Sequence, residues 1–460
     1  MKKLLLTSAL FTATSLSAFS QDSVQFSRNQ VADDIRFLIS NASEIHPNLY
    51  HDVLPATLNY KVDSLINTLP DVVPSLTAYN AFLQATGFIG EGHTSVNTPP
   101  FIRSQFKSGR LKYIPLVVTG YNNEKFEANV IEKGKEIENI KVISINGILS
   151  KTLLNQMMQL KGGLPSFKKV VAIKSFPLFL AALGVQAPYV IEYVDKNSNK
   201  GSLTLGGVTS PEYLSATANG TANPAPYTFT VLEGQYGYFN FRSMEKRDRF
   251  EKFTDSVFKA IAEQKIDKLV VDLRENSGGD SGLGDYLLSY LTKSSYRMAG
   301  GSELKVSEQF KTHMKTPGLN YTKPAKYFTM DNGTSMKFGP NDTRKPNKQE
   351  YFYRGKVCFL IGSFTFSSAN MLASTIKDYR LATLIGEPVG EPANDYGELC
   401  PIKLPNTRFE AFTSTTLWIR PNGNTKDSAP VAPDILVETK NQAGDNVLRY
   451  SMNWLDGKNK

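Results

Sequence analysis

Apolar residues recur at helical spacing through the first part of the chain. The sets that we expect to face a core are Val31, Ile35, Leu38 and Ile39, followed by Leu76, Tyr79, Phe82 and Leu83. Prolines at positions 47, 55, 70 and 74 separate the predicted helices, because proline lacks the N–H that a helical hydrogen bond needs. We therefore predict an N-terminal helical domain over residues 21–98.

Between residues 105 and 205 the pattern changes to short β-like runs. These runs lie at 114–118, 141–145 and 189–193, and the pair Asn146-Gly147 is a strong turn signal. A stretch rich in Gly, Ser, Thr, Ala and Pro follows at 206–226 and is typical of a linker. We expect a β-rich domain over residues 105–205.

A strand–helix–strand rhythm begins after the predicted linker. The expected strands lie at 236–242, 269–274, 357–361 and 381–385, with helices near 250–261, 283–291 and 367–379. Such alternation is typical of an α/β layer with helices covering a sheet. We predict one α/β domain over residues 225–440, followed by a tail at 441–460. A polar insertion at 294–349 either caps a cleft or forms a surface excursion.

The first 20 residues have the features of a signal peptide. Lys2 and Lys3 form a basic start, residues 4–18 are apolar or small, and a small-x-small pattern precedes Gln21. We expect removal of residues 1–20 and export to the periplasm or the extracellular space. No later stretch reaches the ~18 apolar residues of a membrane span, so we expect no integral membrane span.

Charge and cysteines exclude several classes of function. The formal net charge of +9 falls to +7 once Lys2 and Lys3 are removed. The basic residues are dispersed, so we expect no nucleic-acid partner. Cys358 and Cys400 either form a disulfide or stay free, with Cys358 as a buried thiol. No Cys/His cluster has zinc spacing, and no phosphate-binding Gly-Lys-Ser/Thr loop occurs.

Two segments of the α/β domain carry candidate chemistry. At 272–279 a predicted buried strand runs into Gly278-Gly279, whose N–H groups either contribute to an oxyanion hole or only form a tight turn. Ser367 stands at the start of a predicted helix. Its hydroxyl either caps that helix or attacks a carbonyl whose oxyanion the helix N-terminus would stabilise.

A serine nucleophile needs a base and an orienting carboxylate. The chain has four histidines. His46, His51 and His313 fall in loop-like or Lys-rich surroundings, whereas His93 follows a glycine-rich approach that would project it into a cleft. Asp427 lies in an Asp/Pro-rich segment and is either the orienting acid or a turn residue.

Taken in order, five motifs resemble the C-terminal processing peptidase, tricorn and interphotoreceptor retinoid-binding protein superfamily. They are Gly-Glu-Gly-His-Thr at 90–94, Tyr-Phe-Asn-Phe at 238–241, Asp-Leu-Arg-x-Asn-x-Gly-Gly at 272–279, Thr-Phe-Ser-Ser-Ala-Asn at 365–370 and Pro-Val-Ala-Pro-Asp at 430–434. The resemblance implies a crotonase/ClpP-like catalytic domain. The phrase at 142–148 is similar to the end of a PDZ-type module, so the β-rich domain is expected to be PDZ-like.

The resemblance also implies roles for individual residues. It makes Ser367 the nucleophile, His93 the base and Asp427 the acid. Oxyanion donors would be the N–H groups of Ser368 and of Gly278 or Gly279. Two positions depart from the pattern, because Asn370 stands where Glu is common and Asp427 stands where tricorn-like members carry Glu. The tail-specific branch uses a lysine in a Gly-Lys-Gly loop, but residues 386–394 contain none.

The sequence therefore predicts an exported serine-type peptidase that acts on peptides or unfolded proteins through an acyl-enzyme, with no metal or organic cofactor. The rival interpretations are an esterase with the same triad and an inactive protein on the same fold that binds peptides or hydrophobic ligands. If Asp427 is only a turn residue, then Glu391, Asp395 or Glu398 is expected to orient His93. The oligomeric state and the substrate sequence stay open.

Overall fold

The computed structural model describes residues 24–131, 139–217, 224–317, 324–340, 342–439 and 444–458. The expected signal peptide at 1–20 lies outside the described residues. Export therefore stays a prediction, which N-terminal sequencing of exported chain would test. Among the described helices, none combines the length and the apolar character that crossing a bilayer requires.

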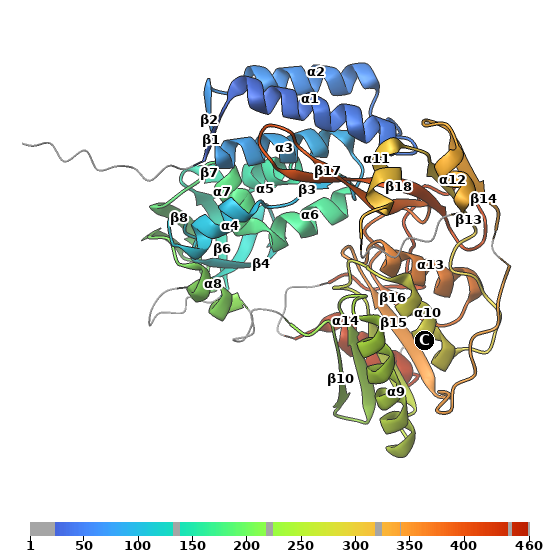
Figure 1. The fold of residues 1–460 in the computed structure, drawn as a ribbon. Coiled ribbons are helices and arrows are strands. Elements are labelled where there is room, and N and C mark those ends of the chain that lie inside the picture. The colour runs from blue at the N-terminus through green and yellow to red at the C-terminus, as the bar shows by residue number, and fades with distance from the viewer. Residues whose placement is uncertain are drawn as a thin grey trace, which may run out of the picture.

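The N-terminal region is helical, as predicted. It contains α1 (Arg28–Ile45), α2 (Pro55–Asn67) and α3 (Ser75–Ile89), with the short strands β1 (Gln25–Ser27) and β2 (Val72–Pro74) paired beside them. Ser27 and Gln30 form a capping box at the start of α1, which satisfies two N–H groups that a helix start leaves free. These helices form the upper layer in Figure 1.

The second region contains helices as well as the strands that its sequence predicts. Strands β4 (Leu116–Asn122), β5 (Lys125–Val130), β6 (Ile140–Ile145), β8 (Tyr189–Val194) and β9 (Lys200–Leu205) form a sheet in that order, and β7 (Ile148–Leu149) pairs with β6. Helices α4 (Pro100–Lys107), α5 (Ser150–Met158), α6 (Pro165–Lys174) and α7 (Phe176–Ala182) accompany this sheet. The predicted linker contains α8 (Ser210–Thr217) in its described part.

The third region has the predicted α/β layering. Its sheet follows the order β10 (Tyr227–Leu232), β11 (Tyr236–Phe241), β12 (Lys268–Asp272), β15 (Lys356–Ile361), β16 (Thr383–Gly386) and β19 (Ile435–Leu436). All neighbours are parallel except β10 and β11. Helices α9 (Arg247–Glu263), α10 (Ser281–Leu291) and α13 (Ser368–Tyr379) share one apolar core with the sheet, and α14 (Asn446–Leu455) packs in another.

The insertion after α10 belongs to a second sheet rather than to a surface excursion. Strands β14 (Ser335–Phe338), β13 (Gly301–Lys305), β18 (Glu410–Ile419) and β17 (Asp395–Lys403) pair in that order, and β3 (Ser95–Val96) adds to β18. Two helices of the insertion, α11 (Glu308–Met314) and α12 (Ala325–Thr329), lie beside these strands in Figure 1. This sheet joins the N-terminal helices to the α/β layer.

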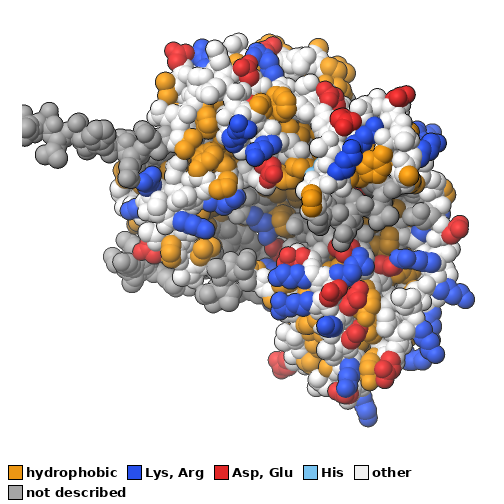
Figure 2. Space-filling model, in the orientation of Figure 1, with side chains coloured by type: hydrophobic (Ala, Val, Ile, Leu, Met, Phe, Trp, Pro, Cys, Tyr) orange, Lys and Arg blue, Asp and Glu red, His pale blue; other side chains and the backbone are white. Residues whose placement is uncertain are grey.

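The structure shows the state of the two cysteines and the distribution of charged side chains on one face. Cys358 and Cys400 are both buried and free, so the alternative of a disulfide between them is wrong for this structure. On the face drawn in Figure 2, Lys and Arg side chains are scattered among Asp and Glu.

Candidate active site

Ser367 occupies a sharp turn between β15 and α13. Its backbone has φ 55° and ψ −128°, which a non-glycine residue rarely adopts and which costs about 1–3 kcal/mol. The Ser367 side chain makes no capping hydrogen bond to α13. The simple capping role is therefore not observed, and the hydroxyl group is left for other chemistry. A strained serine between a strand and a helix is typical of hydrolase nucleophiles.

The double glycine lies directly against this turn. A Cβ on Gly278 would stand 2.7 Å from Ser367 Cβ and 2.9 Å from Ser368 N, so only glycine fits there. Ser368 Oγ donates a hydrogen bond of 2.5 Å to the Gly279 carbonyl oxygen, which holds the two segments together. The ends of β12 and β15 are neighbours because these strands pair in parallel.

The N–H groups around the turn are not equally free. Gly278 N–H donates to Asn276 Oδ1 at 2.8 Å, so it is already satisfied. Within the described residues, no acceptor is recorded for the N–H of Ser368 or of Gly279. Of the expected oxyanion donors, Ser368 and Gly279 therefore have free N–H groups, whereas Gly278 contributes its lack of a side chain.

His93 comes from the N-terminal region and is carried to the site by its neighbours. Strand β3 follows it directly and pairs with β18. Glu91 accepts hydrogen bonds from the backbone N–H groups of His93 (2.5 Å) and Thr94 (2.7 Å), which folds the Gly-Glu-Gly-His segment into a tight loop. Thr94 also contacts Thr413 of β18 at 3.0 Å. The His93 ring packs on the Phe366 ring with centroids 4.5 Å apart, next to Ser367.

The two nitrogens of the His93 imidazole have different surroundings. Nδ1 lies 3.3 Å from Glu91 Oε1 and 3.7 Å from Glu391 Oε2. Nε2 is buried and has no hydrogen-bond partner among the described residues. A carboxylate at Nδ1 favours the tautomer whose Nε2 carries a lone pair, which is the form that a general base needs.

Three buried carboxyl groups surround the base, and their protonation differs. Burial alone would raise the pKa of Glu91, but the hydrogen bonds and charge of His93 and the charge of His46 lower it overall. Burial, followed by the charge of Asp395, raises the pKa of Glu391 well above its usual range. Burial also raises the pKa of Asp395 to about 7. The pKa of Glu91 is thus lowered beside His93, while the pKa values of Glu391 and Asp395 are raised.

Asp427 lines the same cavity as Glu91, but no hydrogen bond or ion pair joins it to His93 within the described residues. Its carboxylate accepts hydrogen bonds from Arg420 and, at 3.1 Å, from the N–H of Ala429. The Arg420 guanidinium, which also binds Asp378, satisfies the charge that a triad would otherwise use. Glu398, another candidate, accepts from Thr416 at 2.8 Å. The acids next to His93 are Glu91 and Glu391. The sequence analysis named Glu391 as an alternative but did not single out Glu91, despite its place in the His93 motif.

Asn370, which stands where glutamate is common in the family, is buried in the first turn of α13. Its amide donates a 2.8 Å hydrogen bond to the carbonyl oxygen of Pro392. The residue therefore supports the loop that carries Glu391. No group of three or more His, Cys, Asp or Glu in the described part of the chain has the arrangement of a metal site.

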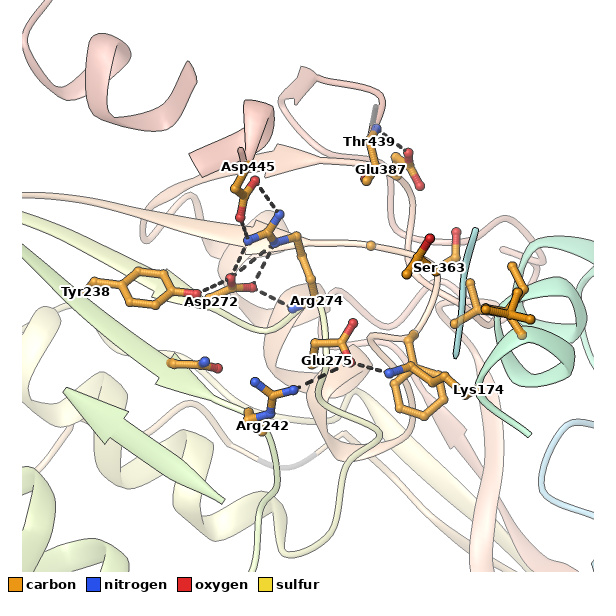
Figure 3. Close-up of a pocket in the computed structure, with 17 residues that line it drawn as sticks. Lys174, Tyr238, Arg242, Asp272, Arg274, Glu275, Ser363, Glu387, Thr439 and Asp445 are labelled. Atoms are coloured by element: carbon orange, nitrogen blue, oxygen red, sulfur yellow. Dashed lines mark hydrogen bonds and ion pairs between the residues drawn. The ribbon is translucent and has the colours of Figure 1, made fainter. Parts of the chain in front are cut away.

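Two cavities flank these residues. One, of about 470 Å³, is lined by Glu91, Phe366, Glu391 and Asp395, with apolar walls from Leu164 and Leu417. A second, of about 570 Å³, opens between α6 and the ends of β11 and β12 (Figure 3). There Arg274 lies between Asp272 and Asp445, and Lys174 of α6 reaches Glu275, close to the glycine turn. The first cavity, beside the base, is the better place for a reacting substrate.

Comparisons with a family model and with solved structures also indicate a peptidase. Residues 235–437 match the model of peptidase family S41. The solved structure of mature CPAF has a TM-score of 0.61 at 14% identity, covering 93% of this chain and 96% of that chain. Its complex with lactacystin has a TM-score of 0.60 at 13% identity, covering 93% and 98%. No curated protein matches the sequence.

At 13–14% identity the structural likeness establishes only the fold, and the family match indicates the class of enzyme. The matched segment includes the strained Ser367, the double glycine at 278–279 and the Glu391 loop. The match of residues 235–437 to peptidase family S41 supports a serine-type peptidase.

Proposed function

We propose that the chain cleaves peptide bonds through an acyl-enzyme, with Ser367 as nucleophile and His93 as general base. Nε2 of His93 takes the Ser367 proton, and the serine oxygen attacks the peptide carbonyl carbon. The N–H groups of Ser368 and Gly279 stabilise the oxyanion. His93 then protonates the leaving amine, and water hydrolyses the acyl-enzyme.

The observation that carries this proposal is the state of Ser367 itself. Its backbone is strained, its hydroxyl does not cap the helix, and an imidazole with an unpaired Nε2 packs on its neighbour Phe366. A structural serine would have no need of this strain, which the surrounding contacts maintain. We assign Glu91 as the carboxylate that orients His93, in place of Asp427.

The finer fold descriptions belong to the same proposal. The parallel strands β11, β12, β15 and β16, with Ser367 at a strand end, support a crotonase/ClpP-like catalytic domain. The β4–β9 sheet with α6 beside its edge strand β4 supports a PDZ-like domain. Superposition of an experimental structure on such domains would test both descriptions.

Labelling with a serine-reactive fluorophosphonate tests the nucleophile. The wild-type chain is expected to take the label on Ser367, located by peptide mass spectrometry. Ser367→Ala should lose both labelling and peptide hydrolysis while it keeps its circular dichroism spectrum. Ser368→Ala, which removes only the hydroxyl that contacts Gly279, should still be labelled. Labelling of Ser368 instead, or none at all on a folded wild-type chain, would contradict the assignment and favour the binding-protein alternative.

A further inference from the structure

We propose that Glu391 is a positioning residue that ties the main chain of Ser367 to the imidazole of His93 through one side chain. This inference rests on the proposed function and adds to it a residue that touches both reacting groups. Glu391 lies in the loop between β16 and β17, where the tail-specific branch that the sequence resembles would carry a catalytic lysine.

The two oxygens of the Glu391 carboxyl group face the two partners separately. Oε1 accepts the hydrogen bond of the Ser367 backbone N–H. Oε2 lies 3.7 Å from His93 Nδ1. Only 6% of the Glu391 side chain is exposed, so water does not compete for these contacts. A shift of Glu391 would therefore displace the nucleophile and the base together.

The contact with Ser367 matters because of the serine's backbone. At φ 55° and ψ −128°, Ser367 is held in a conformation that its own chain does not favour. Its N–H points away from the helical hydrogen-bond ladder of α13, so an acceptor from outside the helix has to meet it. Glu391 supplies that acceptor, and without it a half-buried N–H would be unpaired at the strained residue.

The loop that carries Glu391 is itself fixed to the nucleophile turn. Gly390 N–H donates to the Thr365 carbonyl oxygen at 3.0 Å. A Cβ on Gly390 would stand 2.4 Å from the Ser363 carbonyl oxygen, so the loop approaches as closely as glycine permits. Together with the bond from Asn370 to Pro392, these contacts hold Glu391 from both sides.

Burial and the neighbouring Asp395 raise the pKa of Glu391 well above its usual range. A protonated Glu391 side chain has one O–H donor and keeps an oxygen that accepts from Ser367. A glutamine has the same pattern, because its amide nitrogen donates and its carbonyl oxygen accepts. Glutamine at 391 is therefore expected to preserve the positioning, whereas a side chain without an acceptor is not.

The experiment measures the second-order rate of fluorophosphonate labelling on Ser367 in the full chain, beside kcat and KM for a peptide substrate. The variants are Glu391→Gln, Glu391→Ala and Glu391→Met, the last of which keeps the length of the side chain without an acceptor. Circular dichroism and the melting temperature report folding. Glu387→Gln is the matched control, since Glu387 lies in the same loop and accepts the N–H of Thr439 at 2.7 Å, away from Ser367.

We expect Glu391→Ala and Glu391→Met to lower the labelling rate at least a hundredfold through kcat rather than KM. Glu391→Gln should label at least tenfold faster than either variant, and Glu387→Gln should match wild type. If Glu391→Ala does not fold, the Met and Gln variants give the same comparison. Equal rates for Gln and Met, or a Met variant within threefold of wild type, overturn the inference. Absence of label on wild-type Ser367 overturns the proposed nucleophile instead.

Discussion

His93 lies within 4 Å of Glu91 and Glu391, and the pKa values of the two glutamates shift in opposite directions. Glu91 is closer to Nδ1 and its pKa is lowered, whereas the pKa of Glu391 is raised and its carboxyl group reaches Ser367 as well. Asp427 satisfies Arg420 instead. At the scale of single residues, this geometry supports the proposal that Glu91 orients the imidazole.

This assignment predicts opposite results for two conservative substitutions. Glu91→Gln should lower kcat by up to ~10⁴-fold, because the imidazolium loses its counter-charge and the tautomer preference. Asp427→Asn should keep kcat within about threefold, since the amide oxygen still accepts the Ala429 N–H. Peptide hydrolysis by both variants, with folding checked by circular dichroism, decides between them. A large loss in Asp427→Asn with an active Glu91→Gln would restore Asp427 as the acid.

At the scale of elements, the site depends on how two parallel strands end. Strands β12 and β15 are neighbours, and each runs into a turn that opens a helix, α10 or α13. The turn after β12 supplies Gly278 and Gly279, and the turn after β15 supplies Ser367 and Ser368. The carboxyl ends of parallel strands lie at one edge of a sheet, which is where such folds place their ligands.

A substitution at Gly278 tests whether the turns after β12 and β15 pack tightly against each other. Gly278→Ala would place a methyl group 2.7 Å from Ser367 Cβ at φ 100°, a backbone conformation that costs a non-glycine residue about 1–3 kcal/mol. We expect loss of hydrolysis and labelling of at least a hundredfold, with a lowered melting temperature. Gly362→Ala is the control, because its Cβ would meet only Arg274 side-chain atoms at 3.6 Å or more. An active Gly278→Ala variant would show that the two turns are not tightly coupled.

At the scale of the whole molecule, the site is assembled from distant regions. The N-terminal helices bring His93, the α/β layer brings Ser367, and the second sheet joins them through β3 and β18. Asp34 of α1 strengthens this union, since its carboxylate accepts hydrogen bonds from Asn406 and Thr407 between β17 and β18. The union buries Glu91, Glu391 and Asp395 together.

Burial of these acids makes the stability of the fold depend on pH. The pKa of Asp395 is raised from 3.8 to about 7 in the folded chain, so the folded state holds this proton more firmly than the unfolded state does. Its contribution to stability is fully present below about pH 4 and is lost as the pH rises through 7. His46 acts in the opposite sense, because burial lowers its pKa to about 4 and its contribution is lost as the pH falls from 6.5 through 4.

Asp395→Asn removes the first of these two effects. The difference in the free energy of unfolding, variant minus wild type, should increase by about 1 kcal/mol per pH unit between pH 5 and 7. Urea unfolding at pH 5, 6, 7 and 8 measures the difference, in which the His46 contribution cancels. Parallel stability curves for the two proteins would mean that Asp395 has an ordinary pKa in the folded chain.

The sequence by itself predicted many of the elements and the proposed reacting pair. Hydrophobic spacing predicted α1, α3 and the β11–α9–β12 unit, because a helix or strand that buries one face has apolar residues at regular intervals. The motifs predicted Ser367 and His93, because a strand that leads to a serine at a helix start, and a histidine after flexible glycines, are local patterns.

Only the tertiary structure decided which acids lie beside His93. The local sequence left Asp427, Glu391, Asp395 and Glu398 as candidates and did not single out Glu91, since a carboxylate acts on whatever the fold brings within a few ångströms of it. The strand pairings and the glycine contacts at 278 and 390 set those distances, and the guanidinium of Arg420 engages Asp427. The raised pKa values of Glu391 and Asp395 likewise depend on burial by three regions at once, which the sequence of a single segment does not show.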